Sequence, residues 1–229
     1  MNRASRPPSG KTSRKTARAA PQRPAAARPY HHGDLRHALV EAAYDLVTEG
    51  GAEMVSVREA ARRAGVSPGA PFRHFASRDA LLAAVAEEAQ RRFRAEIDKA
   101  LRQVTTDDPL QRFRALGLAY LRWALRNPAH FEVISSGRLF DFETSAGLRE
   151  DNVELIGMAG RTLTEAAGRG LLRSRDIKLM QIAGRALVYG FARMKTDGHF
   201  PRWAVKDGEI DAMAEAVLDL FIAGIAKDG

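Results

Sequence analysis

The residues best suited to bind a ligand gather in one short stretch, SVREAARRAGVSPGAPFRHF, which covers residues 56–75. Five arginines lie between Ser56 and Arg78, and Glu59 is the one acidic residue among them. Guanidinium groups donate paired hydrogen bonds to phosphate oxygens, and hydroxyls such as that of Ser67 add further donors. The stretch therefore predicts a phosphate-binding surface; the alternative is a charged helical hairpin that only faces solvent.

Two short helices joined by a glycine turn are expected to position these groups. A serine with Glu59 three residues further on has the spacing of a capping box, for a helix over residues 56–64. A serine followed directly by Pro68 is typical of a helix cap and first turn, for a second helix over residues 67–75. Gly65 can adopt the positive φ of a tight helix exit. This order is that of a helix-turn-helix, whose second helix fits the major groove of DNA.

The sequence from Tyr30 to Val85 resembles the N-terminal DNA-binding region of the tetracycline-repressor (TetR) family. The most specific parts of the resemblance are VREAARRAGVSPGAPFRHF and the following SRDALL. It implies that the serine before the first short helix and the residues at the end of the second contact phosphates, whereas the first turn of the second helix reads bases. The expected DNA-binding residues are Ser56, Arg58, Ser67, Pro68, Gly69, Ala70, Phe72, Arg73, His74 and Arg78.

Two positions depart from the common family pattern. Phe72 stands where tyrosine is frequent, so a phenolic hydrogen bond to phosphate cannot form. Pro71 stands where an aliphatic residue is frequent and removes a backbone donor near the helix start, which is expected to open the first turn without ending the helix. We therefore expect Pro68, Gly69 and Ala70 to make mainly apolar contacts, for example with thymine methyl groups.

The rest of the chain predicts an all-α fold of about nine helices. Apolar residues recur at steps of 3 and 4 from a first helix capped by Asp34 to a last helix over residues 210–224, and no alternating strand pattern or internal repeat is present. A long fourth helix with Leu82, Val85 and Phe93 on one face is expected to join two domains. The expected domains are a basic tail (residues 1–29), a DNA-binding domain (30–80) and an effector-binding and dimerisation domain (81–229).

The C-terminal half is expected to dimerise and to bind a small effector. The segment YLRWALRNPAHFEVISS resembles the WHG-type subgroup of TetR-like C-terminal domains. Two regular apolar helices from each subunit would form a four-helix bundle, and the same faces could instead fill the core of one subunit. The expected interface residues are Met180, Gly184, Leu187, Phe191, Met213, Val217 and Leu220. The expected effector-contacting residues are Phe113, Tyr120, Trp123, Phe131, Met158, Tyr189 and Phe191, which could equally be core residues.

Composition excludes several other classes of protein. The chain has 229 residues and no cysteine, which rules out disulfides and thiolate chemistry and favours the cytoplasm. No apolar run approaches the roughly 20 residues of a membrane-spanning helix. The net charge of +8 equals the eight cations of residues 1–29, a segment without acidic residues that is expected to be disordered and to track phosphates.

Two rival functions remain open at this point. An all-α enzyme would need a catalytic constellation, but the six histidines form no HExxH pair and we expect no catalytic residue, cofactor or metal. His31, His32 and His37 could bind a metal, although solvation or an approach to DNA is the simpler reading. A non-specific architectural protein would use the basic tail but not the helix-turn-helix. The favoured interpretation is a homodimeric repressor that binds palindromic double-stranded DNA and is released by a small apolar or aromatic effector.

Overall fold

Eight α-helices and five short 3-10 helices make up residues 32–227, the part of the chain that the computed structural model describes. Within these residues no strand forms, and Leu172 and Ala226 make only an isolated antiparallel bridge. The all-α prediction is therefore confirmed. The expected basic tail and His31 lie outside the described residues. The chain from His32 onward clusters as one compact unit.

The first part of this unit, residues 32–77, is called the headpiece below. Its elements are α1 (His32–Gly50), η1 (Ala52–Met54), α2 (Val57–Arg63) and η2 (Pro71–Arg73). The predicted stripe of α1 is confirmed, because Leu39, Ala42 and Leu46 are all buried. Asp34 lies inside α1 and is not its cap, since the helix has already begun at His32. Gly51, at φ 79°, follows the end of α1 in a conformation that favours glycine.

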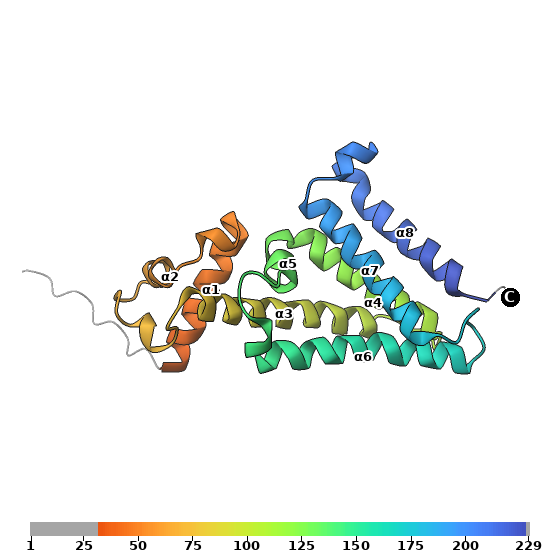
Figure 1. Cartoon of the computed structure of the whole chain (residues 1–229), viewed down its shortest axis with the longest axis horizontal. Coiled ribbons are helices and arrows are strands. Elements are labelled where there is room, and N and C mark those ends of the chain that lie inside the picture. Colours follow the sequence, from red (N-terminus) through yellow and green to blue (C-terminus); the bar gives the residue numbers. More distant parts are fainter. Residues whose placement is uncertain (1–31, 228–229) are drawn as a thin grey trace, which may run out of the picture. The chain divides into compact units, whose positions relative to one another are not determined.

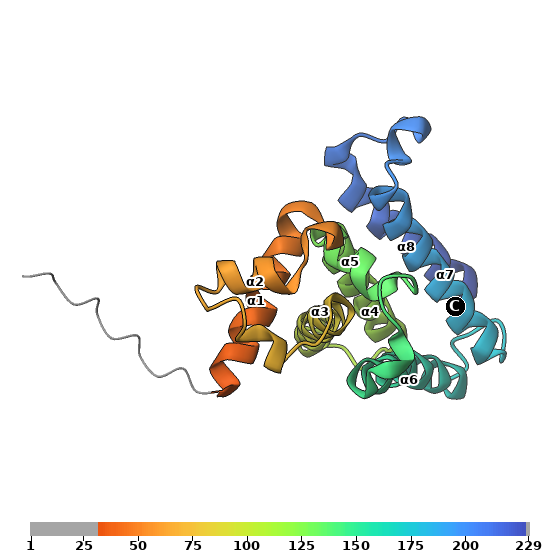
Figure 2. The ribbon, with the colours of Figure 1, turned by 60° about the vertical axis from the view of Figure 1, so that its left-hand side comes forward.

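The remaining helices form the body. They are α3 (Arg78–Arg102), α4 (Pro109–Arg126), α5 (Pro128–Ser135), α6 (Ala146–Gly168), α7 (Ile177–Thr196) and α8 (Ile210–Ile225). Helix α4 lies at the centre and packs against α3, α5, α6, α7 and α8. Figure 1 shows α6 running along α3, with α7 and α8 on the other side of α4, and Figure 2 gives the same arrangement nearly end-on to α3. No helix in residues 32–227 is long and apolar enough to cross a membrane.

Helix α3 belongs to the body and also packs against α1 of the headpiece. The Ser77 Oγ accepts a hydrogen bond from the Ala80 N–H at 3.1 Å, so this side chain caps the start of the helix. Its stripe is as predicted: Leu82 and Val85 are buried in the main core, and Phe93 packs on the rings of Tyr120 and Trp123 on α4. The helix runs without interruption through the expected domain boundary at residues 80–81, and that boundary stays a prediction.

Candidate nucleic-acid interface and effector site

Helix α2 begins as the sequence predicted, but only half of the capping box forms. Ser56 is extended, at φ −143° and ψ 154°, and its Oγ accepts a hydrogen bond from the Glu59 N–H at 3.1 Å. The Glu59 carboxylate turns instead to Arg62, which donates to it from Nε and Nη2 at 2.9 and 2.6 Å. Arg58 is exposed on the first turn of α2. The cap therefore orders α2 while leaving a cation beside its start.

The predicted glycine turn is confirmed. Gly65 adopts φ +68°, and a Cβ at this position would meet no atom within 4 Å, so the backbone angle alone favours glycine. The turn is closed by hydrogen bonds from the Gly65 N–H to the Arg62 carbonyl and from the Val66 N–H to the Ala61 carbonyl, at 3.2 and 3.1 Å. The chain thus leaves α2 in a fixed direction.

The prediction of a second helix over residues 67–75 is wrong. Its absence explains why the described residues form eight α-helices where nine were expected. The segment forms a turn, with the Ala70 N–H bonded to the Ser67 carbonyl at 3.1 Å, followed by the single 3-10 turn η2. Pro71 is the physical reason. It has no N–H to donate to the Ser67 carbonyl, and in an α-helix its ring would collide with that carbonyl. We call residues 67–73 the reading turn.

The reading turn is anchored at one end and exposed along most of its length. Pro71 and Phe75 are buried, and the guanidinium of Arg36 lies over the Phe75 ring at 5.4 Å. By contrast, Phe72 is 48% exposed and Arg73 is exposed. Ser67, Pro68 and Gly69 are also exposed, while Ala70 and His74 are half-buried. The exposed surface of the turn is therefore largely apolar and ends in the cation Arg73.

The five arginines of residues 56–78 divide into two groups. Arg62 and Arg63 are paired with Glu59 and Glu49, and these hydrogen bonds hold the pKa of each carboxyl below its usual value. Arg78 donates to the carbonyls of Val55 and Ala52 at 3.0 and 2.8 Å, so it ties α3 to the chain before α2.

Arg58 and Arg73, in contrast, have no carboxylate partner within residues 32–227. They are therefore available to an anion. Direct phosphate contact by Arg78 stays a prediction, and the structure adds an internal role that its sequence position did not suggest.

The seven expected effector residues do not line one site. Tyr120, Phe131 and Tyr189 come together, with ring centroids 6.1 Å apart for Tyr120 and Phe131 and 5.8 Å for Phe131 and Tyr189. The Arg185 guanidinium lies over the Tyr120 and Tyr189 rings. Burial raises the pKa of Tyr120 to about 12. Trp123 joins this aromatic cluster through Phe93, at 5.0 Å.

The other three effector candidates lie elsewhere. Phe113 belongs to a separate buried cluster and faces Phe221 at 6.4 Å. Phe191 packs on Phe200 at 4.9 Å, and Met158 is half-buried against the main core. Effector contact by the seven residues stays a prediction.

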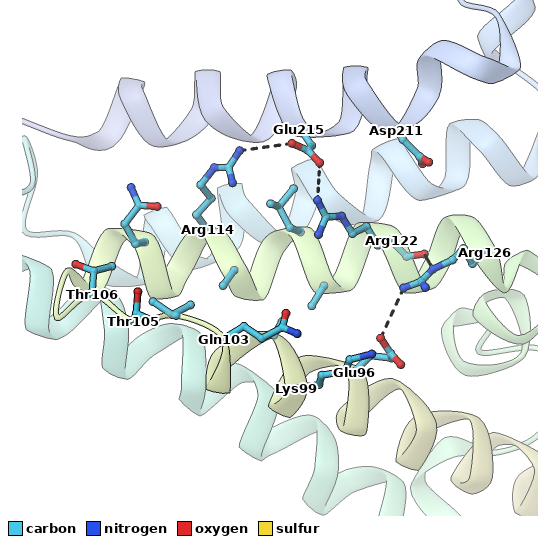
Figure 3. Close-up of a pocket in the computed structure, with 16 residues that line it drawn as sticks. Glu96, Lys99, Gln103, Thr105, Thr106, Arg114, Arg122, Arg126, Asp211 and Glu215 are labelled. Carbon is cyan, nitrogen blue, oxygen red and sulfur yellow. Dashed lines mark hydrogen bonds and ion pairs between the residues drawn. The ribbon is translucent and has the colours of Figure 1, made fainter.

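A groove that the sequence analysis missed lies between α3, α4 and α8 (Figure 3). It has a volume of about 770 Å³, an apolar floor that includes Leu118 and Ala119, and cations along its walls. Ion pairs span it: Arg122 meets Glu215 at 2.5 Å and Arg126 meets Glu96 at 3.7 Å (Figure 3). The sequence indicates this groove only through a four-residue spacing, which places Arg114, Leu118, Arg122 and Arg126 on one face of α4.

The expected interface residues divide between the inside and the outside of the protomer. Met180, Gly184 and Phe191 are buried in the core, and a Cβ at Gly184 would lie 3.2 Å from the Phe113 ring. Leu187 and Val217 are half-buried, whereas Met213 is 39% and Leu220 75% exposed. The predicted stripe of α7 is thus the one that faces inward, an alternative that the sequence left open. The outward face carries Leu179 and Ile182, which are 61% and 56% exposed.

Comparisons with known proteins cover both halves of the chain. The family profile described as bacterial regulatory proteins, tetR family, matches residues 39–85, and the tetracyclin repressor-like C-terminal domain matches residues 113–221. The second description names no narrower subgroup, so the WHG-type resemblance stays a prediction.

Individual relatives agree with this. The fatty acid metabolism regulator protein of Bacillus subtilis (strain 168) is 22% identical over 201 residues, covering 82% of this chain and 93% of the relative. A solved protein of unknown function from Rhodococcus sp. RHA1 is 29% identical, with a TM-score of 0.74, covering 88% of this chain and 100% of its own.

The structure of FadR from Bacillus subtilis in complex with stearoyl-CoA shares the fold, with a TM-score of 0.63 at 17% identity, covering 82% of this chain and 98% of the other. Both family profiles fall on the parts of the structure described above: the first on the headpiece and the start of α3, the second on α4 to α8. The chain therefore belongs to the tetracycline-repressor (TetR) family of bacterial regulatory proteins, and it is a DNA-binding regulator of transcription and not an enzyme.

Proposed function

We propose that the protein is a cytoplasmic, homodimeric repressor that binds a palindromic operator and leaves it when a small effector binds to the body. The observation that carries this proposal is the reading turn, which presents the exposed residues 67–69 and the half-buried Ala70, together with the exposed cations Arg58 and Arg73. Family membership supplies the DNA-binding role. Palindromy, dimerisation and release are the parts that experiment has to establish.

The headpiece would divide its work between backbone and base contacts. Ser56, Arg58, Arg73, His74 and Arg78 would hold phosphates and Phe72 would pack against the backbone, so these residues would position the headpiece. The reading turn offers the exposed ring of Pro68 and, in part, the methyl group of Ala70, with no long polar side chain from residues 68 to 70. Such a surface suits the C5 methyl groups of thymine in the major groove.

The outward faces of α7 and α8 would form the dimer interface. Leu179, Ile182, Met213 and Leu220 are large apolar side chains that are exposed in the protomer. Two such faces related by a two-fold axis would make a four-helix bundle and place two headpieces on successive turns of DNA. We expect Leu220→Lys to shift sedimentation from dimer to monomer. Val153→Lys is the matched control, because Val153 is 70% exposed on α6; a dimer that survives Leu220→Lys would contradict this interface.

Selection of DNA from a random-sequence library tests the main proposal. At moderate salt, a sequence-specific regulator enriches one palindrome, whereas a non-specific architectural protein enriches none. Arg73→Ala, which leaves the expected base-reading residues 67–70 unchanged, should recover the same palindrome with lower yield. Absence of any enriched sequence would favour the architectural alternative.

An effector with an apolar chain is favoured by the aromatic cluster of the body, and the relative crystallised with stearoyl-CoA indicates a first probe. The cations along the groove would suit the phosphates of such a ligand, although Arg122 and Arg126 have carboxylate partners. Release of the selected DNA by stearoyl-CoA, with coenzyme A and stearate as separate controls, tests this class. Tyr189→Leu in the cluster and Lys99→Glu in the groove then distinguish the two locations.

A further inference from the structure

Three side chains from three helices form a stack where the headpiece meets the body. The ring of Tyr44, on α1, lies between the Arg92 guanidinium of α3 and the His130 imidazole of α5. The guanidinium carbon is 3.9 Å from the centroid of the Tyr44 ring. The centroids of the Tyr44 and His130 rings are 3.6 Å apart, and the two ring planes are inclined by 20°. Tyr44 and His130 are only 6% and 2% exposed. We call these three residues the junction stack.

Directional bonds fix the junction stack at both ends. The His130 Nε2 lies 3.1 Å from the Tyr44 carbonyl oxygen, so a neutral imidazole with its proton on Nε2 donates to that oxygen. Arg92 donates to both oxygens of Glu41 on α1, at 2.7 and 2.6 Å, and to Glu88 on α3 at 2.6 Å. Apolar packing tolerates small rotations of one helix on another, whereas these bonds are sensitive to distance and angle. The stack therefore restricts how α1 can tilt.

A tilt of α1 would be passed to the DNA-binding surface. Helix α1 packs against both α2 and η2, and its Arg36 covers the Phe75 ring that anchors the reading turn. We propose that Tyr44, Arg92 and His130 are positioning residues, which set the orientation of the headpiece on the body and thereby its affinity for DNA. Preorganisation of this kind increases affinity because less freedom is lost when DNA binds.

Helix α5 also connects the stack to the aromatic cluster. His130 contacts the headpiece, while its neighbour Phe131 is 1% exposed among the rings of Tyr120 and Tyr189. A ligand that displaced Phe131 would move the same two turns of helix that hold the stack. This step rests on the proposed effector function; the positioning role does not, since it concerns DNA binding alone.

Intrachain distances measure the orientation directly. Because the chain has no cysteine, Arg58→Cys on α2 and Thr164→Cys on α6, both exposed, accept spin labels at defined positions, and excess unlabelled protein isolates distances within one chain. We expect His130→Ala to broaden the distance distribution. His130→Phe keeps a ring in the stack but loses the bond to the Tyr44 carbonyl, and an intermediate width is expected from it.

DNA affinity is measured on the unlabelled full chain with the DNA that the wild type selects from a random library. We expect His130→Ala to bind this DNA roughly tenfold more weakly and His130→Phe roughly threefold more weakly, at a temperature where both are folded. The salt dependence of binding should stay that of the wild type, since no phosphate contact is removed. Loss of a phosphate-binding residue would change that slope.

Phe200→Ala is the matched control, because Phe200 is 4% exposed and packs against the tilted ring of Phe191 within the body. It should lower stability while leaving the distance distribution and DNA affinity unchanged. Wild-type distances and wild-type affinity in both His130 variants would overturn the positioning role. So would equal effects in Phe200→Ala, which would mean that any loosening of the core weakens DNA binding. Failure of the selection to yield a specific DNA would count against the proposed function and leave the distance measurement as the test of the stack.

Discussion

The headpiece and the body differ in how far they expose the residues that are expected to bind DNA or an effector. Most residues of the reading turn lie exposed, and Arg62, Arg63 and Arg78 hold together the elements around it. In the body, Tyr120, Trp123 and Phe131, three of the residues expected to bind an effector, are buried among other rings. The reading turn is therefore exposed along most of its length, whereas an effector site in the aromatic cluster would have to open.

Truncation of one aromatic residue in each region gives the largest expected contrast. Phe131 is 1% exposed, so Phe131→Ala should lower the free energy of unfolding by about 3–5 kcal/mol through lost burial and a cavity. Phe72 is 48% exposed, and Phe72→Ala should lower it by less than about 1 kcal/mol. Urea unfolding of both variants checks the comparison. Equal losses would mean that the reading turn is as deeply packed as the cluster.

The junction between the regions is expected to respond to pH. Burial lowers the pKa of His130 to about 4 from 6.5, with the positive charge of Arg92 acting in the same direction and the hydrogen bond to the Tyr44 carbonyl and the charge of Asp45 acting against it. Between these values the unfolded chain binds a proton that the folded chain does not. The free energy of unfolding should therefore decrease as pH falls from 6.5 to 4, by up to about 3 kcal/mol.

Urea unfolding of the wild type and His130→Phe at several pH values isolates this contribution, because carboxylates that titrate in the same range are shared by both proteins. The difference in unfolding free energy between them should change across the window. A constant difference would show that the histidine is not held neutral in the folded protein.

The sequence predicted the frame of the headpiece better than its surface. The Ser56 cap and the turn at Gly65 follow from local rules about hydrogen bonding and backbone angles, and both are confirmed. The prediction of a helix over residues 67–75 was wrong because a serine–proline pair is typical of a first turn whether or not a helix follows it. The missing donor of Pro71 decided the outcome.

In the body, periodicity predicted the helices but not the direction in which their faces point. Both sides of α7 are apolar, since Met180 and Gly184 lie on one side and Leu179 and Ile182 on the other. Their burial depends on packing against α4 and α8, which no local pattern encodes. The junction stack was equally hidden, because Tyr44 and His130 are 86 positions apart.

Charge removal tests which headpiece arginines face DNA. Arg73 has no carboxylate partner within the described chain, so Arg73→Ala should weaken binding roughly tenfold on all sequences and reduce the salt slope by about 1. Arg62→Ala is the control, since Arg62 already pairs with Glu59; its effect should be smaller. A loss confined to some sequences would assign Arg73 to base reading.

The smallest expected effect concerns the reading turn itself. Substitution of deoxyuridine for thymidine removes only the C5 methyl group from the selected DNA, with its hydrogen-bonding pattern intact. If Pro68, Gly69 and Ala70 read by apolar contact, one such change in each half-site should weaken binding about fourfold per methyl, from the roughly 0.8 kcal/mol of a buried methyl or methylene.

Deoxyuridine at thymidines outside the half-site centre should have no effect. An unchanged affinity at every position would mean that the turn does not read thymine methyl groups, and would favour selection through DNA shape.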